Sequence, residues 1–397
     1  MPHGWPGGCG IADQVREGHD EQAARLDAVT EIVLREAVDE RWSSPLPHRW
    51  SSSSRPLIEP IAVLDDEDAA LTLALVARGI SPRTWCDDLR DEEAARAVLL
   101  AQTVMRANAE ISPTIVQALD GARTVLWRLP KAVSAVDEYA ELIARHAAPD
   151  VLVVAGGRDK HLSRSMNEAL ARHFSSVVAS RGARKARALV ARGPVPVAAR
   201  WPQVRKLEQL DLLVAAHGAT FNTNRLDRGT ALLISCFDRL PHGDRAIDLG
   251  CGSGLMAALL ARQGRSVTAA DVTWSACDAA RRTAEANGLG VEVFRRDGLD
   301  GWAELVDLIV LNPPFHVRSA KDTEPTRRLF EQAGRALRQG GELWCVYNSH
   351  LPYLDWIRAL VGTATIAARD SGYVTVRAVV TESGANTKSQ PRPLNSN

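Results

Sequence analysis

Short apolar runs alternate with helical patterns along two stretches of the chain. In the first stretch the pattern predicts strands at Ile61–Leu64, Thr124–Leu129, Val151–Ala155 and Ser176–Ala179, and helices at Asp68–Arg78, Val133–Arg145 and Leu162–His173. An earlier amphipathic helix is predicted within Glu21–Trp42. Strands that alternate with helices favour a parallel sheet with helices packed on its faces.

The same alternation restarts beyond the Pro/Gly-rich segment Gly193–Pro196 and the turn at Pro202. It predicts strands at Arg245–Asp248, Ser266–Ala270, Val291–Arg295, Leu305–Leu311, Glu342–Tyr347 and Tyr373–Val380, and helices at Ala231–Arg239, Gly254–Arg262, Ser275–Asn287 and Thr326–Leu337. Two α/β units of similar size indicate a duplication of one architecture. We therefore expect an N-terminal extension and linker over 1–56, α/β domains over 57–200 and 201–384, and a tail over 385–397.

The composition agrees with two globular domains. The chain has 397 residues, of which 45% are hydrophobic and 24% charged, values that exclude coiled-coil and wholly disordered proteins. No apolar run approaches the roughly 18 residues of a membrane span, and the first residues do not resemble a signal peptide. The six cysteines occur singly, without CxxC spacing, which argues against a metal site or a disulfide framework. We expect a cytoplasmic protein that holds no metal and makes no membrane contact.

The charges balance overall but are distributed unevenly. Acidic and basic residues number 48 each. Acidic residues predominate from Leu57 to Glu93, whereas Arg181–Lys206 carries basic residues and no acidic one. A basic run is ordinarily a solvated helix face, but the absence of any carboxylate over this length favours a surface that faces a polyanion. The candidates for RNA contact are Arg181, Arg184, Lys185 and Arg187.

A glycine-rich turn is the strongest local signal of chemistry. The segment Ala246–Gly254 reads as an apolar strand that runs into a turn and then a helix, with Asp248, Gly250, Gly252 and Gly254 as its marked positions. Glycines permit positive φ, and the N-terminus of the following helix offers free N–H groups to a ligand. Asp271 ends the next strand, where its carboxylate can accept from ribose hydroxyls. These residues alone fit both NAD and S-adenosylmethionine.

A second motif, Asn312-Pro-Pro-Phe315, follows the apolar run Leu308–Leu311. It places an amide oxygen and a peptide carbonyl at the carboxyl end of a strand, next to prolines that cannot donate. Two acceptors at one point suit a primary amino group conjugated to a ring or a carbonyl, since accepting both N–H bonds favours the nucleophilic form of the amine. Phe315 can stack on the planar group. A structural Asn-Pro turn is the alternative, and the preceding glycine turn favours the functional interpretation.

Taken together, these motifs resemble class I S-adenosylmethionine-dependent methyltransferases that modify amino groups. With Phe221–Thr230, Asn312–His316, Asn348–Tyr353 and Tyr373–Ala378, the chain resembles the bacterial ribosomal RNA guanine-N2 methyltransferases. This resemblance implies two tandem Rossmann-like α/β domains, the first degenerate and the second catalytic. Leu129–Lys131 is similar to the large-subunit (23S) enzymes, methyltransferase G, and Leu351–Tyr353 to the small-subunit (16S) enzymes, methyltransferase C.

The resemblance also implies roles for single residues. Asp248, Gly250, Gly252 and Gly254 would surround the methionine part of S-adenosylmethionine. Asp271 would bind its ribose and Asp297 its adenine amino group. Asn312 and the carbonyl of Pro313 would hold the guanine amine, Phe315 would stack on the base, and His316 would touch the RNA backbone. The expected partner is ribosomal RNA or a ribosomal subunit, and we expect the protein to act as a monomer.

The first domain lacks the corresponding chemistry. Asp65–Asp68 stands where a glycine turn would follow the strand Ile61–Leu64, and this half contains no Asn-Pro-Pro. The carboxylates would oppose an anionic ligand group, so we expect a non-catalytic domain. Other interpretations remain open at this point: methyl transfer to adenine N6, to a protein glutamine or to a small molecule, and an RNA-binding assembly protein without catalytic activity.

Overall fold

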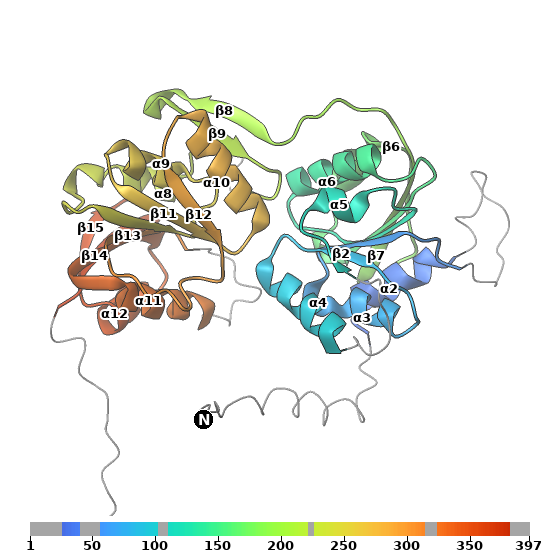
Figure 1. The fold of residues 1–397 in the computed structure, drawn as a ribbon, viewed down its shortest axis with the longest axis horizontal. Helices are drawn as coiled ribbons and strands as arrows, with labels where there is room; N and C mark the ends of the chain where they lie inside the picture. The colour runs from blue at the N-terminus through green and yellow to red at the C-terminus, as the bar shows by residue number, and fades with distance from the viewer. Residues whose placement is uncertain (1–25, 40–55, 102–109, 221–225, 314–323, 382–397) are drawn as a thin grey trace, which may run out of the picture.

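The computed structural model describes residues 26–39, 56–101, 110–220, 226–313 and 324–381. Within these ranges the chain forms two α/β domains that lie side by side, with a two-stranded hairpin in the connection between them (Figure 1). Each domain is built on a seven-stranded mixed sheet with helices on both faces. The predicted fold of two tandem α/β domains is confirmed.

The first domain is formed by the elements up to Pro194. Its strands are β1 (Ile61–Leu64), β2 (Arg83–Trp85), β3 (Glu110–Ile111), β4 (Thr124–Arg128), β5 (Leu152–Arg158), β6 (Phe174–Ala179) and β7 (Ala186–Pro194). Its helices are α2 (Ala28–Ala37), α3 (Ala70–Val76), α4 (Leu89–Ala101), α5 (Ile115–Leu119), α6 (Val133–His146) and α7 (Arg164–Ala171). The sheet order is β3-β2-β1-β4-β5-β7-β6, with β7 antiparallel to both neighbours.

The second domain follows the hairpin of β8 (Gln203–Leu207) and β9 (Leu212–Ala216). Its strands are β10 (Arg245–Leu249), β11 (Ser266–Asp271), β12 (Val291–Arg295), β13 (Val306–Leu311), β14 (Leu337–Asn348), β15 (Thr363–Arg369) and β16 (Tyr373–Val379). Its helices are α8 (Arg228–Ile234), α9 (Leu255–Arg262), α10 (Trp274–Ala286), α11 (Glu324–Ala336) and α12 (Tyr353–Leu360). The order β12-β11-β10-β13-β14-β16-β15 repeats that of the first domain strand for strand.

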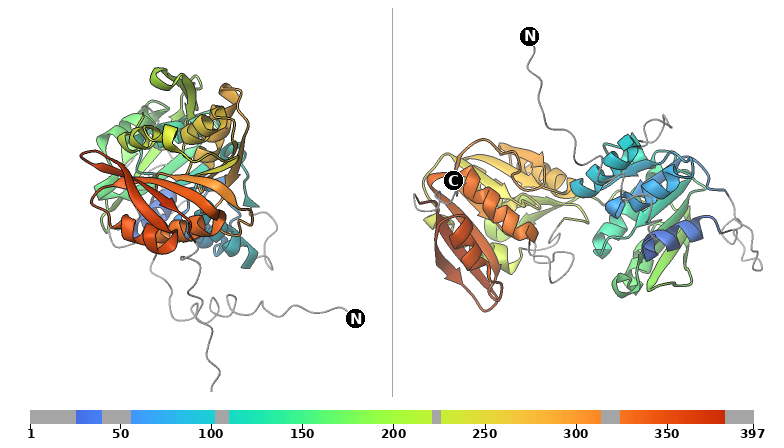
Figure 2. Two further views of the ribbon diagram at one scale, coloured as in Figure 1. Left: turned by 90° about the vertical axis from the view of Figure 1, so that its left-hand side faces the viewer. Right: turned by 90° about the horizontal axis from the view of Figure 1, so that it is seen from below.

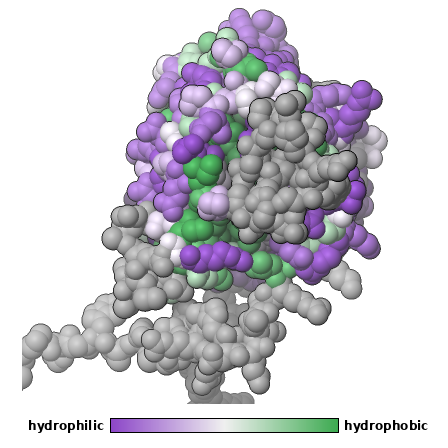
Figure 3. All heavy atoms as spheres, turned by 90° about the vertical axis from the view of Figure 1, so that its right-hand side faces the viewer, coloured by the Kyte–Doolittle hydropathy of each residue, from purple (hydrophilic) through white to green (hydrophobic). Residues whose placement is uncertain are grey.

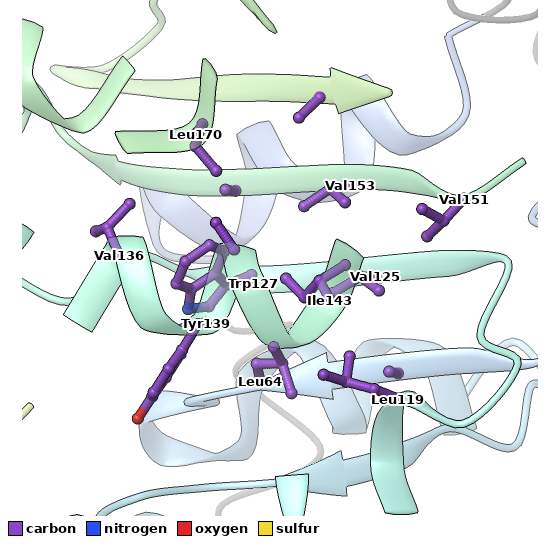
Figure 4. Close-up of a cluster of buried hydrophobic side chains, with 14 of the residues drawn as sticks. Leu64, Leu119, Val125, Trp127, Val136, Tyr139, Ile143, Val151, Val153 and Leu170 are labelled. Atoms are coloured by element: carbon purple, nitrogen blue, oxygen red, sulfur yellow. The ribbon is translucent and has the colours of Figure 1, made fainter. Parts of the chain in front are cut away.

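Buried apolar side chains fill both faces of each sheet. In the first domain, α5, α6 and α7 cover one face, where Trp127 and Tyr139 pack with their ring centroids 5.6 Å apart (Figure 4). Helices α2 and α3 cover the other face. In the second domain, α11 and α12 lie on one face and α8, α9 and α10 on the other (Figure 1). Burial of these faces is the main driving force for each fold.

The repeat allows residues of the two domains to be matched. The N–H of Asp65 donates to the carbonyl of Trp85, and the N–H of Gly250 donates in the same way to Ala270. Asp65 therefore occupies the position of Gly250. By the strand register, Cys86 then matches Asp271.

The domains contact each other through matched segments, the residues that follow β2 and β11. Asp88 and Thr273 form an antiparallel bridge. On either side of it, Leu89 donates to the carbonyl of Val272 (3.0 Å) and Trp274 donates to the carbonyl of Asp87 (2.9 Å). Since Leu89 matches Trp274, the pairing has a local two-fold symmetry. Figure 2 shows the two lobes from two further sides.

Side chains reinforce this interface. The Asp87 carboxylate accepts from the N–H of Ser275 (2.7 Å) and from its hydroxyl (2.8 Å), and so caps the N-terminus of α10. The guanidinium of Arg295, at the end of β12, donates to the carbonyls of Cys86 and Asp87 and pairs with Glu92. The acidic excess of the first domain therefore includes two residues, Asp87 and Glu92, that bind the second domain.

A histidine after β9 forms a separate link between the domains. His217 is 5% exposed. Its Nδ1 lies 2.5 Å from Glu138 Oε1 on α6, and its Nε2 lies 2.7 Å from Asp278 Oδ2 on α10. The next residue, Gly218, donates its N–H to Glu138 and accepts from the hydroxyl of Ser134 (2.6 Å).

Hydrophilic residues occupy much of the visible surface at the outer end of the first domain, away from the second domain (Figure 3).

Several elements, most of them short, were not predicted from the sequence patterns. These are β2, β3, β7, β8, β9, β15, α4, α5 and α12. The helix predicted at Ala231–Arg239 was misplaced: α8 begins at Arg228, because Asp227 caps it by accepting from the N–H of Thr230 (3.0 Å), and it ends at Ile234. A separate 3-10 turn covers Phe237–Arg239.

Candidate functional site

A cavity of about 710 Å³ opens at the carboxyl ends of β10, β11 and β13. Parallel strands bring their carboxyl ends to one edge of a sheet, which is where open α/β sheets bind ligands. Most of the site residues predicted from sequence line this cavity together: Asp248, Gly250, Gly252, Asp271, Asp297, Asn312 and Pro313. Phe315 and His316 lie outside the described residues.

The glycine turn between β10 and α9 forms one wall. Gly250 and Gly252 have φ of 72° and 52°, and nothing lies within 4 Å of where a Cβ would be at either position. Any other residue would strain the turn and extend its side chain into open space beside the cavity. Gly254 does not line the cavity. It precedes α9, and a Cβ there would lie 2.7 Å from the Cα of Ala280, so it permits close packing of α9 on α10.

Asp271 connects the glycine turn to the end of β11. Its Oδ2 accepts from the N–H of Gly252 (3.1 Å), and its Oδ1 accepts from the N–H and the hydroxyl of Thr273 (2.9 Å each). Three protein donors leave about one of the roughly four acceptor sites of the carboxylate for a ligand hydroxyl. Burial raises the pKa of Asp271 despite these hydrogen bonds.

A second buried carboxyl lies beneath the turn. Asp248 Oδ2 accepts from the N–H of Ala257 on α9 (2.9 Å). Burial, with the nearby charge of Asp271, raises the pKa of Asp248 to about 7. A cation beside these two carboxyl groups would stabilise their ionised forms, so the site favours a positively charged ligand group.

Asn312 follows the last residue of β13, and the two ends of its side-chain amide differ in their partners. Its Nδ2 donates to Thr230 Oγ1 on α8 (3.0 Å). Its Oδ1 is buried and has no hydrogen-bond partner among the described residues. An orphaned buried acceptor is costly unless a ligand satisfies it. The arrangement therefore suits a ligand that presents an N–H or O–H donor at this point.

The far side of the cavity contains residues from both domains. Asp297, which follows β12, lies 3.5 Å from the guanidinium of Arg328 on α11. Asp88 and Arg90 of the first domain also line the cavity, and the Arg90 guanidinium pairs with Asp88 (2.5 Å). The hydrogen bond to Asp88, with the negative charges of Asp88 and Asp297, raises the pKa of Arg90. The first domain thus supplies part of the wall.

Several residues that line the cavity were not predicted from the sequence; among them are Asp88, Arg90, Asp227 and Thr230. No local pattern marks Asp88 or Arg90, because their position depends on how two segments far apart in sequence pair. Asp227 and Thr230 carried a weak signal: they sit in Leu226-Asp-Arg-Gly-Thr230, part of the segment that resembles the family but to which no chemistry was given.

The basic residues predicted to contact RNA lie elsewhere. Arg181, Arg184 and Lys185 are in the loop between β6 and β7, and Arg187 is near the start of β7. Arg184 pairs with Glu31 on α2 (2.5 Å) and Arg187 pairs with Asp159 (3.5 Å). Acidic residues distant in sequence therefore offset part of this charge. The assignment of the loop to RNA stays a prediction.

The matched edge of the first domain carries different residues. Cys86 takes the place of Asp271. The Asp65 carboxyl, whose pKa is raised by burial and by the charge of Asp87, takes the place of Gly250. The Asp66 carboxylate accepts from the N–H groups of Leu71 (2.8 Å) and Thr72 (2.6 Å). It thus occupies the helix N-terminus that an anionic ligand group would use. This arrangement supports the prediction of a non-catalytic first domain.

Three further findings concern metal ligands, membrane spans and cysteines among the described residues. No group of three His, Cys, Asp or Glu within them is arranged to hold a metal ion. None of the helices in the described ranges is both long and apolar enough to cross a membrane. Five of the six cysteines are described, and all five are free and buried.

Comparison with known proteins gives matches over both domains. The family model for the RLMG N-terminal domain matches residues 46–194, and that for the methyltransferase small domain matches residues 211–377. Ribosomal RNA large subunit methyltransferase G of Streptomyces avermitilis is 32% identical over 345 residues, spanning 83% of this chain and 89% of that protein. The protein of the same name from Alcanivorax borkumensis is 30% identical, over 79% and 83% of the two chains.

The second domain has additional relatives. Ribosomal RNA small subunit methyltransferase C of Hahella chejuensis is 40% identical over 161 residues, which is 40% of this chain and 47% of that protein. Among solved structures, a T. thermophilus 16S rRNA N2 methyltransferase in complex with AdoMet and guanosine superposes with a TM-score of 0.70. That structure is 20% identical and aligns over 90% of this chain and 93% of its own. The two proteins share the two-domain fold.

Proposed function

This chain belongs to the family of ribosomal RNA large subunit methyltransferase G, and on that premise we propose that it methylates the N2 amine of a guanine in large-subunit ribosomal RNA. The methyl donor is S-adenosylmethionine. Ribosomal RNA, free or within a subunit, is the partner, and the protein acts as a cytoplasmic monomer. The choices of methyl donor and of RNA partner draw on the names of the relatives and on the chemistry of the cavity.

The cavity fits S-adenosylmethionine. When bound, this cofactor supplies a methyl group on a positively charged sulfur. Asp248 and Asp271 have raised pKa values and gain from a cationic neighbour. Gly250 and Gly252 leave open space for close approach to the backbone. Asp271 retains acceptor capacity for a ribose hydroxyl, and Asp297, which lines the same cavity, would accept from the adenine amino group.

The observation that carries the proposal is the orphaned Oδ1 of Asn312. An exocyclic amine of a nucleobase has two N–H groups and a lone pair that is delocalised into the ring. We infer that Asn312 Oδ1 and the carbonyl of Pro313 accept these two N–H bonds, which localises the lone pair on nitrogen and directs it toward the methyl group. These acceptors also stabilise the positive charge that develops on the amine during transfer.

Substitution of Asn312 tests this role. Asn312→Ala should lower the rate of methyl transfer by ~10²-fold or more, because it removes a preorganised acceptor that acts in the transition state. The dissociation constant of S-adenosylmethionine, measured by calorimetry, should change by no more than about threefold. Asn167→Ala, a half-buried position on α7 outside the cavity, is the control and should leave both values unchanged. Wild-type turnover in Asn312→Ala would contradict the assignment.

The identity of the methylated nucleoside tests which substrate the enzyme uses. Ribosomal RNA or subunits from a strain that lacks the enzyme are incubated with the protein and labelled cofactor, digested, and analysed by mass spectrometry of nucleosides. We expect N2-methylguanosine in the large-subunit RNA. Methylguanosine in 16S RNA would move the target to the small subunit. N6-methyladenosine, or label on protein, would replace the substrate assignment.

A further inference from the structure

Thr230 holds the protein side of the Asn312 amide. It lies in the first turn of α8 and is 8% exposed. Its Oγ1 accepts from Asn312 Nδ2 at 3.0 Å. Because this hydrogen bond occupies the nitrogen end of the amide, the oxygen end is the one left without a partner beside the cavity.

The orientation of this amide decides which ligand group can bind. With Oδ1 toward the cavity, Asn312 presents an acceptor to an amine. Rotated by half a turn, it would present two N–H donors to the N–H bonds of the same amine, and neither side could form a hydrogen bond. A hydroxyl can donate or accept, so Thr230 can bond to either end of the amide. In the structure its Oγ1 accepts from Nδ2, and this is the orientation that leaves Oδ1 to accept from an amine.

Thr230 is itself held in place by contacts of α8 with its cap and with the sheet. Its N–H donates to Asp227 Oδ1 (3.0 Å), the cap of α8. The preceding Arg228 donates to Asp370 Oδ2 and to the Ser371 hydroxyl (3.0 Å each), in the turn between β15 and β16. Between them, a Cβ on Gly229 would lie 3.1 Å from the Tyr373 ring, so the helix packs closely on β16. The hydroxyl is thus anchored to the sheet independently of any ligand.

We propose that Thr230 is a positioning residue for methyl transfer, which orients the Asn312 amide so that its oxygen accepts from the target amine. Thr230 touches neither reacting atom and acts through Asn312 alone. The donation from Nδ2 to Oγ1 also polarises the amide and makes Oδ1 a stronger acceptor. This inference rests on the proposed function, since it specifies how the acceptor of that reaction is held.

The test is a set of threonine substitutions in the full chain. Thr230→Val keeps the volume but removes the acceptor, and should lower kcat roughly 10- to 100-fold, the range expected when a buried polar partner is lost. Thr230→Ser keeps the hydroxyl and should retain kcat within about threefold of wild type. The dissociation constant of S-adenosylmethionine should stay within about twofold in both variants. The matched control is Thr375→Val in β16. Its buried hydroxyl has no hydrogen-bond partner among the described residues and does not line the cavity, so the kcat of this variant should equal that of wild type.

A second measurement separates positioning from support of the fold. In the Asn312→Ala background, Thr230→Val should cause no further loss of kcat, because the group through which it acts is already absent. Undiminished turnover in Thr230→Val would overturn the inference, as would an equal further loss in the double variant or a drop in cofactor affinity. Should valine destabilise the fold, Thr230→Ala replaces it with the same expectations. The proposed function fails separately, if Asn312→Ala alone keeps wild-type turnover.

Discussion

Replacing His217 by glutamine should remove a pH-dependent link between the domains. The imidazole lies between Glu138 of the first domain and Asp278 of the second. Burial alone would lower the pKa of His217, but hydrogen bonds and the charges of the two carboxylates outweigh it and raise the pKa to about 9, from 6.5 in a solvated chain. The folded protein therefore binds this proton more tightly than the unfolded chain does.

The size and sign of the effect follow from this difference. A rise of about 2.5 units corresponds to about 3 kcal/mol of stability, since each unit is worth about 1.4 kcal/mol. The group has a raised folded pKa, so its contribution is fully present below about pH 6.5 and is lost as the pH rises through about 9. Between about pH 7 and about pH 10 the wild type should lose about 2 to 3 kcal/mol that His217→Gln never had.

Reversible denaturant unfolding at several pH values measures this difference. The free energy of unfolding of wild type minus that of His217→Gln should fall by the amount given above across the window. His161→Gln, an exposed histidine of the first domain whose pKa is lowered by burial and by nearby lysines, should track the wild type from about pH 7 upward. A difference between wild type and His217→Gln that does not change with pH would show that His217 is neutral at about pH 7 and would refute the reasoning.

Three further predictions concern the cofactor and the RNA. Asp271→Asn should weaken S-adenosylmethionine binding roughly 10- to 100-fold in calorimetry, because an amide cannot accept from Gly252, Thr273 and a ribose as the carboxylate does. Unchanged affinity would show that Asp271 does not bind the ribose. Arg90→Ala should weaken cofactor binding by about threefold or more without lowering the melting temperature, because Arg90 of the first domain lines the cavity. Equal affinity would show that only the second domain contributes to cofactor binding. Neutralising Arg184, Lys185 and Arg187 together should reduce the slope of log K for RNA against log salt by ~0.7 to 0.9 per lost phosphate contact, and an unchanged slope would assign the loop to its ion pairs with Glu31 and Asp159.

The strands and helices with a clear period were predictable because their burial is regular. β1, β10 and α6 agree with the sequence to within about one residue at each end, since each buries a continuous run or a stripe of apolar side chains. By contrast, β2 and β3 have three and two residues and carry no readable period. They are strands because β1 supplies hydrogen-bonding partners for β2, and β2 supplies them for β3, a condition that no local window contains.

The residues of the candidate site also differ in whether the sequence alone could identify them. Gly250 and Gly252 could be recognised because positive φ and close ligand approach restrict a position to glycine, and Asn312 because prolines follow it at a strand end. The hydroxyl that holds its amide could not be recognised, since Thr230 and Asn312 are 82 residues apart and meet only through the packing of α8.

The sequence by itself determined the duplicated α/β architecture, the glycine turn and the acceptor at the end of β13, because each depends on a few adjacent residues and on the conformations their backbone allows. Only the tertiary structure decided what completes the cavity and joins the domains. Arg90 reaches the cavity, and Asp87 caps α10, because the segments after β2 and β11 pair across the local two-fold axis. Such contacts depend on the distance between side chains that lie far apart along the chain, and that distance is set by the packing of whole domains.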